Sequence, residues 1–109
     1  MAILEKDRIK LQATAVDKED AIRQTGELLV SSSCVAAPYV EGMLAREATM
    51  STYLGNGVAI PHGQFEDRAH IKQTGISVLQ LPAGVAWEED ELAYLIIGIA
   101  ANSYEHMTV

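Results

Sequence analysis

The sequence feature that most constrains the fold is a nearly continuous apolar run, LAYLIIGIAA, at residues 92–101. Such a run is typical of a strand that is buried on both faces of a sheet, because it lacks the alternation of a half-exposed strand. It is shorter than the roughly 18 residues that would indicate a membrane helix. We therefore expect a central strand here, with other elements packed on each side of it.

Two stretches with helical periodicity precede this run. Asp17 is followed at once by charged residues, two of them acidic, which is the pattern of an N-cap and first turn, and apolar residues then recur at helical spacing over about residues 18–31. Pro38 stands where the first residue of a second helix is expected, and Arg46 falls near the end of that helix. The apolar positions of the second helix include Tyr39, Val40, Met43 and Leu44.

The other segments are expected to be strands and loops. Residues 8–16 alternate between apolar and more polar side chains, which fits a half-buried strand or an extended entry segment. Residues 75–81 favour a strand that ends at the Pro-Ala-Gly sequence of residues 82–84. A short strand is expected at residues 85–87, an exposed acidic turn at 88–91 and a polar loop at 64–73. Helices interleaved among strands predict the α/β class, with a mixed β-sheet sandwiched by helices.

Composition indicates one domain over residues 1–109 and limits its partners. Half of the residues are hydrophobic, which is enough for a packed core. Fifteen acidic against eight basic residues give a net charge of −7, which disfavours nucleic acid and anionic membrane surfaces and favours a partner with a positive docking face. The start of the chain has no signal-peptide pattern, and the single cysteine, Cys34, fits a reducing compartment. We therefore expect a cytoplasmic protein.

One histidine stands in an unusual local sequence, YLGNGVAIPHG, at residues 53–63. Gly55 and Gly57 can adopt positive φ, and a brief strand at residues 58–60 leads to a proline that restrains the chain before His62. Gly63 leaves room beside the ring for another molecule to approach closely. The pattern predicts a histidine that is presented on a stiff turn.

Several kinds of chemistry lack their motifs. His62 and His70 are not spaced as paired ligands on a helix, no HExxH occurs and one cysteine rules out the usual zinc patterns, so we expect no metal and no cofactor. Neither a GxSxG elbow nor a GxxxxGK[ST] loop is present. A neutral imidazole can itself attack phosphorus. His106 follows the long apolar strand, at an end where α/β folds place their sites, whereas His70 is expected to be solvated.

The strings GNGVAIPHG, MLARE at residues 43–47 and LIIGIAA followed by Glu105-His106 resemble the enzyme IIA domain of the bacterial sugar phosphotransferase system, mannitol/fructose type. The resemblance spans essentially the whole chain. It is strongest to the mannitol branch, through PYVEGMLARE, STYLGNGVAIPHG and GVAWEEDELAYLIIGIAANSYEH.

This resemblance implies a phosphoryl relay. His62 would accept a phosphoryl group from the histidine phosphocarrier protein and pass it to a cysteine of the IIB domain, for the uptake and phosphorylation of mannitol. His106 matches the family's second active-site histidine, and Arg46 matches an arginine near the phosphohistidine. Membrane association would be indirect, through IIB and IIC. The alternative is a regulatory paralogue of the nitrogen type, which signals by its phosphorylation state through protein binding.

The resemblance also carries an expectation about the end of the chain. Members of the family continue for another helical hairpin beyond the Glu-His pair, and this sequence ends before it. We therefore expect the C-terminal helices of the family to be missing, and the apolar strand at residues 92–101 to be exposed, paired with another copy or covered by an absent segment.

Overall fold

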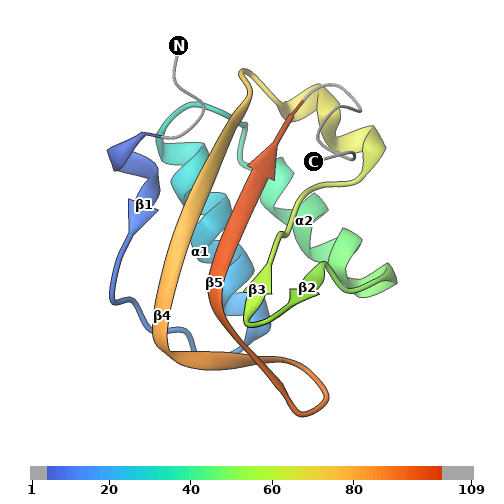
Figure 1. The fold of residues 1–109 in the computed structure, drawn as a ribbon. Helices are drawn as coiled ribbons and strands as arrows, with labels where there is room; N and C mark the ends of the chain where they lie inside the picture. The colour runs from blue at the N-terminus through green and yellow to red at the C-terminus, as the bar shows by residue number, and fades with distance from the viewer. Residues whose placement is uncertain (1–4, 102–109) are drawn as a thin grey trace.

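The computed structural model describes residues 5–101, which form a mixed five-stranded sheet with helices (Figure 1). The order across the sheet is β1-β4-β5-β3-β2, so β5 lies at its centre, as the apolar run predicted. The β1/β4 and β3/β5 pairs are parallel, and the β4/β5 and β2/β3 pairs are antiparallel. The strands are β1 (Ile9–Lys10), β2 (Tyr53–Gly55), β3 (Val58–Ala59), β4 (Gly75–Glu88) and β5 (Glu91–Ala100).

Both predicted α-helices are confirmed, as α1 (Lys18–Ser31) and α2 (Pro38–Thr49). Asp17 caps α1, since its carboxylate accepts a 2.8 Å hydrogen bond from the backbone N–H of Asp20. Pro38 opens α2, where its missing N–H removes no helical hydrogen bond. The two helices pack against each other on one face of the sheet, and α1 contacts β4 and β5 (Figure 1).

The α/β class and the mixed sheet are confirmed, and the burial of β5 shows how the sheet is covered. Ile96 and Ala100 are buried against the helices, whereas Ile97 and Ile99, which point to the opposite face, are half-buried. Within residues 5–101 both α-helices lie on the same face, so these residues supply one of the two expected helical layers.

The prediction that a strand ends at Pro82 is wrong. β4 continues from Gly75 to Glu88, and its register against β5 shifts between Gln80 and Val85. A bulge of this kind tolerates proline, because the irregular segment needs no ladder hydrogen bond from its N–H. The chain then reverses at residues 89–90, within the acidic segment that was expected to be a turn.

Two other segments differ from expectation. Within residues 8–16 the strand β1 covers only Ile9–Lys10, after a short 3-10 helix η1 (Lys6–Arg8). Gln12 then turns the chain with φ of 53°, and the Ala13 N–H donates a 2.8 Å hydrogen bond to the Gln80 carbonyl of β4. The polar segment at 64–73 contains a second 3-10 helix, η2 (Phe65–His70), which was predicted as loop. Its first turn is held by reciprocal hydrogen bonds between Gln64 and Asp67.

Candidate active site

The histidine turn is fixed to the central strand of the sheet. His62 follows β3 and pairs with Ile99 of β5 in a parallel bridge, and the Ile99 N–H donates a 3.0 Å hydrogen bond to the Pro61 carbonyl. Gly55 and Gly57 have φ of 103° and 81°, which confirms the expected positive values. The turn that carries His62 is therefore docked on the most central element of the fold.

Tyr39 of α2 forms a second connection between this turn and β5. Its hydroxyl accepts a 2.9 Å hydrogen bond from the Gly63 N–H and donates one of 2.9 Å to the Ile99 carbonyl. Burial raises the pKa of Tyr39 to about 12, although the Gly63 hydrogen bond opposes the shift and the nearby Asp67 carboxylate adds to it. The phenol thus keeps its proton and can make both hydrogen bonds at once.

The contact of the His62 ring with the backbone determines its tautomer. Nδ1 lies 2.9 Å from the carbonyl oxygen of Ile60. A carbonyl oxygen can only accept, so Nδ1 carries the proton and Nε2 of the neutral ring has the lone pair. His62 is 8 % exposed as a residue. In the neutral ring with this tautomer the lone pair lies on Nε2, and this nitrogen is buried in the structure.

Arg46 lies near the end of α2, as predicted, and its guanidinium is engaged locally. Nη1 donates a 2.6 Å hydrogen bond to the carbonyl of Met50, which satisfies an acceptor at the helix C-terminus. The Ile60 N–H donates to the Thr52 carbonyl over 3.0 Å, so the chain after Met50 runs antiparallel to the chain that leads to His62. Arg46 is thus held at the end of α2, on the chain that leads into the segment paired with β3.

Of the two other histidines, the structure describes His70 only. His106 lies outside the described residues, and its role stays a prediction. His70 ends η2 and is half-exposed, and its carbonyl accepts a 2.8 Å hydrogen bond from the Ala36 N–H.

Sequence reasoning missed two residues beside the histidine turn. Tyr39 was predicted only as an apolar position of the second helix, although a buried tyrosine hydroxyl needs a partner and so carries a signal of its own. Asp67 accepts a 2.7 Å hydrogen bond from the Gln64 N–H, and its carboxylate lies where a side chain at Gly42 would stand. This contact packs η2 against α2 next to Gly63.

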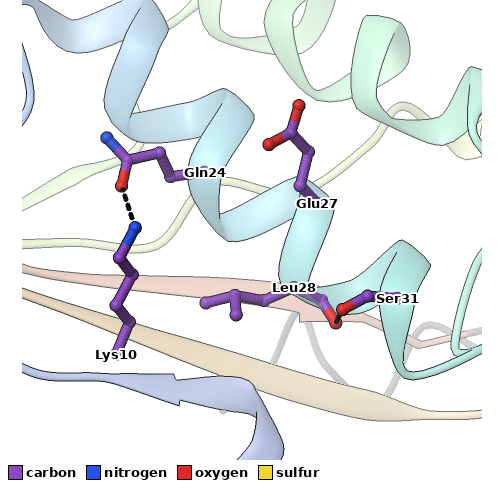
Figure 2. A pocket seen from close by; sticks show the side chains of 5 residues that line it. All are labelled: Lys10, Gln24, Glu27, Leu28 and Ser31. Carbon is purple, nitrogen blue, oxygen red and sulfur yellow. Dashed lines mark hydrogen bonds between the residues drawn. The ribbon is translucent and has the colours of Figure 1, made fainter.

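Two further features of the described residues bear on where a site can lie. Residues 5–101 contain no group of three or more His, Cys, Asp or Glu side chains placed to hold a metal ion. A cavity of about 230 Å³ lies between β1 and α1, and Figure 2 shows the 3.2 Å hydrogen bond from Lys10 to Gln24 at its side. β1 is separated from β5 by β4, so this cavity is not part of the histidine site. It is lined by Lys10, Gln24, Glu27, Leu28 and Ser31.

The fold is that of a phosphotransferase-system IIA domain, since the crystal structure of IIA mannitol from Escherichia coli matches it with a TM-score of 0.90 at 43% identity, over 95% of this chain and 75% of that chain. The chain belongs to the family described as phosphoenolpyruvate-dependent sugar phosphotransferase system, EIIA 2, whose model matches residues 2–109. This confirms the resemblance that the sequence motifs indicated. None of the helices in the described range is long and apolar enough to cross a membrane.

Known relatives agree with this assignment. The chain is 47% identical over 109 residues to a multiphosphoryl transfer protein of Haemophilus influenzae, covering all of this chain and 22% of that protein. It is 41% identical to the mannitol-specific phosphotransferase enzyme IIA component of Geobacillus stearothermophilus, covering all of this chain and 75% of that component. The chain spans 12% to 25% of the multiphosphoryl transfer proteins that it matches.

A solved structure with the same fold is the complex of enzyme IIAMTL and phosphorylated enzyme IIBMTL from Escherichia coli. The TM-score is 0.91 at 40% sequence identity, and the match covers 96% of this chain and 76% of that chain.

Proposed function

We propose that Nε2 of His62 accepts a phosphoryl group from the phosphohistidine of the histidine phosphocarrier protein and passes it to a cysteine of a IIB domain. The observation that carries the proposal is the hydrogen bond between Nδ1 and the Ile60 carbonyl, which leaves the lone pair on Nε2. The solved complex with phosphorylated enzyme IIBMTL and the mannitol-specific relative support a IIB partner and mannitol as the sugar.

The proposed transfer consists of two balanced displacements. The Nε2 lone pair attacks phosphorus, the phosphorus–nitrogen bond of the donor breaks, and the donor imidazole keeps the bonding pair. The His62 ring then carries positive charge, and the Ile60 carbonyl stabilises it by accepting a charge-assisted hydrogen bond from Nδ1–H, which keeps its proton. In the second step a cysteine thiolate attacks phosphorus, and Nε2 recovers its lone pair.

Access to the ring is part of the proposal. His62 is 8 % exposed, so a partner reaches Nε2 only when the ring edge is uncovered. A chain with a net charge of −7 attracts a partner with a positive docking face, which helps the two proteins to meet.

Arg46 and His106 complete the proposed site. The transferring phosphoryl group carries negative charge on its equatorial oxygens, so cationic donors placed around it lower the barrier without a nucleotide or a metal. Arg46 would exchange the Met50 carbonyl for phosphoryl oxygens, to which its fork can bind in a bidentate manner. We assign His106 the same supporting role and no phosphorylation of its own.

We infer that the domain works in the cytoplasm and meets the membrane only indirectly, through IIB and IIC. The family assignment supports this location.

Onward transfer tests the proposal against the regulatory alternative. The chain is phosphorylated with the phosphocarrier protein and then mixed with a mannitol IIB domain, its IIC partner and mannitol. The relay predicts loss of phosphate from the chain and formation of mannitol phosphate. Retention of the phosphate in the presence of IIB, with an effect only on the binding of another protein, would favour the regulatory paralogue.

A further inference from the structure

The hydroxyls of Tyr53 and Tyr39 connect the two ends of residues 57–63, the segment that carries His62, to β5. We call each of these connections a clasp. At the start of this segment, the Gly57 N–H donates to the Tyr53 hydroxyl over 3.0 Å, and that hydroxyl lies within donating distance of two acceptors, the Leu92 carbonyl at 3.1 Å and Oε1 of Glu91 at 3.2 Å. At its end, the Tyr39 hydroxyl joins the Gly63 N–H to the Ile99 carbonyl. Each clasp therefore joins a glycine N–H at one end of residues 57–63 to a carbonyl of β5.

The two clasps differ in their distance from the reacting ring. Ile99 holds both flanks of His62, since its N–H bonds directly to the Pro61 carbonyl and its carbonyl reaches the Gly63 N–H through Tyr39. The Tyr53 clasp holds Gly57, which is five residues earlier in the chain. Loss of the Tyr39 hydroxyl would thus release one flank of His62, whereas loss of the Tyr53 hydroxyl would leave both flanks fixed.

The packing around Gly63 shows that the Tyr39 clasp is a fitted contact. A Cβ at Gly63 would lie 2.6 Å and 2.9 Å from two carbons of the Tyr39 ring, so only glycine allows the phenol to lie against this backbone. Tyr39 is 3% exposed, so water cannot easily replace the phenol in its two hydrogen bonds.

We propose that Tyr39 is a positioning residue for phosphoryl transfer, which holds the Gly63 side of the turn on Ile99 and so keeps Nδ1 of His62 against the Ile60 carbonyl. This inference rests on the proposed role of His62 as phosphoryl acceptor. It adds a residue that acts through the backbone of Gly63 and Ile99. Its effect is to keep the lone pair on Nε2 and the ring in one orientation, and a displacement of about 1 Å at a reacting group can cost up to roughly a hundredfold in rate.

The test compares Tyr39→Phe with Tyr53→Phe as a matched control. Each variant loses one hydroxyl that accepts from a glycine N–H and reaches a β5 carbonyl, and Tyr53→Phe also loses the contact with Glu91, so both should lower the unfolding midpoint. Two further readouts separate them. Nitrogen NMR of the unphosphorylated chain reports the His62 tautomer, and single-turnover labelling with excess phosphorylated carrier protein reports the rate of transfer.

We expect Tyr39→Phe to lose the preference for a protonated Nδ1 and to slow transfer at saturating donor by about tenfold or more, with little change in the donor concentration that half-saturates the rate. Tyr53→Phe should keep the wild-type tautomer and the wild-type rate. A wild-type tautomer and rate in Tyr39→Phe would overturn the inference, as would equal changes in the two variants.

A second variant serves if Tyr39→Phe does not fold. Gly63→Ala keeps the hydroxyl but pushes a methyl group against the phenol ring, so it should shift the tautomer and slow transfer in the same direction. Absence of label on the wild-type chain would count against the proposed function of His62. The tautomer comparison would then still decide whether Tyr39 positions the ring.

Discussion

The N–H of Ile99 donates a 3.0 Å hydrogen bond to the carbonyl of Pro61, which joins the middle of the fold to the residue before the candidate acceptor. Ile99 lies on β5, the central strand of the sheet. Because β5 is held on both sides by neighbouring strands, the position of His62 follows from the core of the domain and does not depend on a mobile surface loop.

Replacement of Arg46 by lysine keeps the charge and loses the bidentate geometry. Lysine can still bind the Met50 carbonyl at the end of α2, so the fold should be retained. We expect transfer to His62 to slow by roughly tenfold, which corresponds to about 1.4 kcal/mol of barrier, and Arg46→Ala to be slower still. Single-turnover rates with excess phosphorylated carrier protein measure the effect. Wild-type rates in both variants would show that Arg46 only caps its helix.

A supporting role for His106 predicts a split between the two transfer steps. His106→Ala should still accept phosphate on His62 but pass it to IIB more slowly, because the cationic partner of the phosphoryl group is lost. Labelling by the carrier protein and chase by IIB measure the two steps separately. Complete loss of labelling while His62 is intact would contradict this role.

Glu47 is a buried carboxylate whose partners are all donors. It accepts hydrogen bonds from the backbone and hydroxyl of Thr52 and from Nε1 of Trp87 at 3.0 Å, and Nζ of Lys18 lies 3.7 Å away. Glu47→Gln would point an N–H₂ group at one of these donors. We expect a loss of about 1–3 kcal/mol of unfolding free energy, measured by urea denaturation.

The control for this substitution is Glu41→Gln. Glu41 is exposed and pairs with Arg23 at 3.0 Å, so its loss should cost less than about 1 kcal/mol. Equal losses for the two substitutions would show that the Glu47 hydrogen bonds contribute no more than a surface ion pair.

Local signals in the sequence predicted the elements that depend on nearby residues. Asp17 and Pro38 marked the starts of both helices, and the apolar run marked the central strand. The bulge after Gln80 and the hydrogen bonds of Tyr39 were missed because each depends on a distant partner. The acceptor of Tyr39, for example, is 60 residues further along the chain, and no local pattern reports such a contact.

The site could be predicted in the same way only in part. The flanking proline and glycines predicted a turn at His62, and the family resemblance gave its proposed chemistry. The expectation of a presented ring with open room beside Gly63 was wrong, because His62 is 8 % exposed and the Tyr39 ring fills the space at Gly63. The tautomer could not be predicted, since it depends on how the ring folds back onto the Ile60 carbonyl. The attachment of Arg46 to Met50 also appears only once α2 has ended and the chain has turned towards β2.

Stability at alkaline pH should depend on Tyr39. Burial, the largest cause, raises its pKa from the ordinary 10.0 to about 12. The folded state thus favours the protonated phenol, and the resulting stability is complete below pH 10 and is lost as the pH rises towards 12. The loss should amount to roughly 2–3 kcal/mol.

Tyr39→Phe has no hydroxyl to ionise, so it serves as the reference with which the pH dependence of the wild type is compared. The difference in unfolding free energy between the wild type and this variant should narrow from pH 10 to pH 12, as measured by urea denaturation at each pH. Titrations of other groups are shared by both proteins and cancel in the difference. If the difference in unfolding free energy stays constant from pH 10 to pH 12, the raised pKa of Tyr39 is contradicted.

The most direct measurement is to locate the phosphate on the chain. The nitrogen-15 histidine-labelled protein is incubated with phosphorylated carrier protein, and nitrogen–phosphorus coupling identifies the modified ring atom. We predict a single phosphate on Nε2 of His62 with Nδ1 still protonated, the same label in His70→Ala, and none in His62→Ala. A phosphate on Nδ1 or on another histidine, or equal labelling of His62→Ala, would contradict the account.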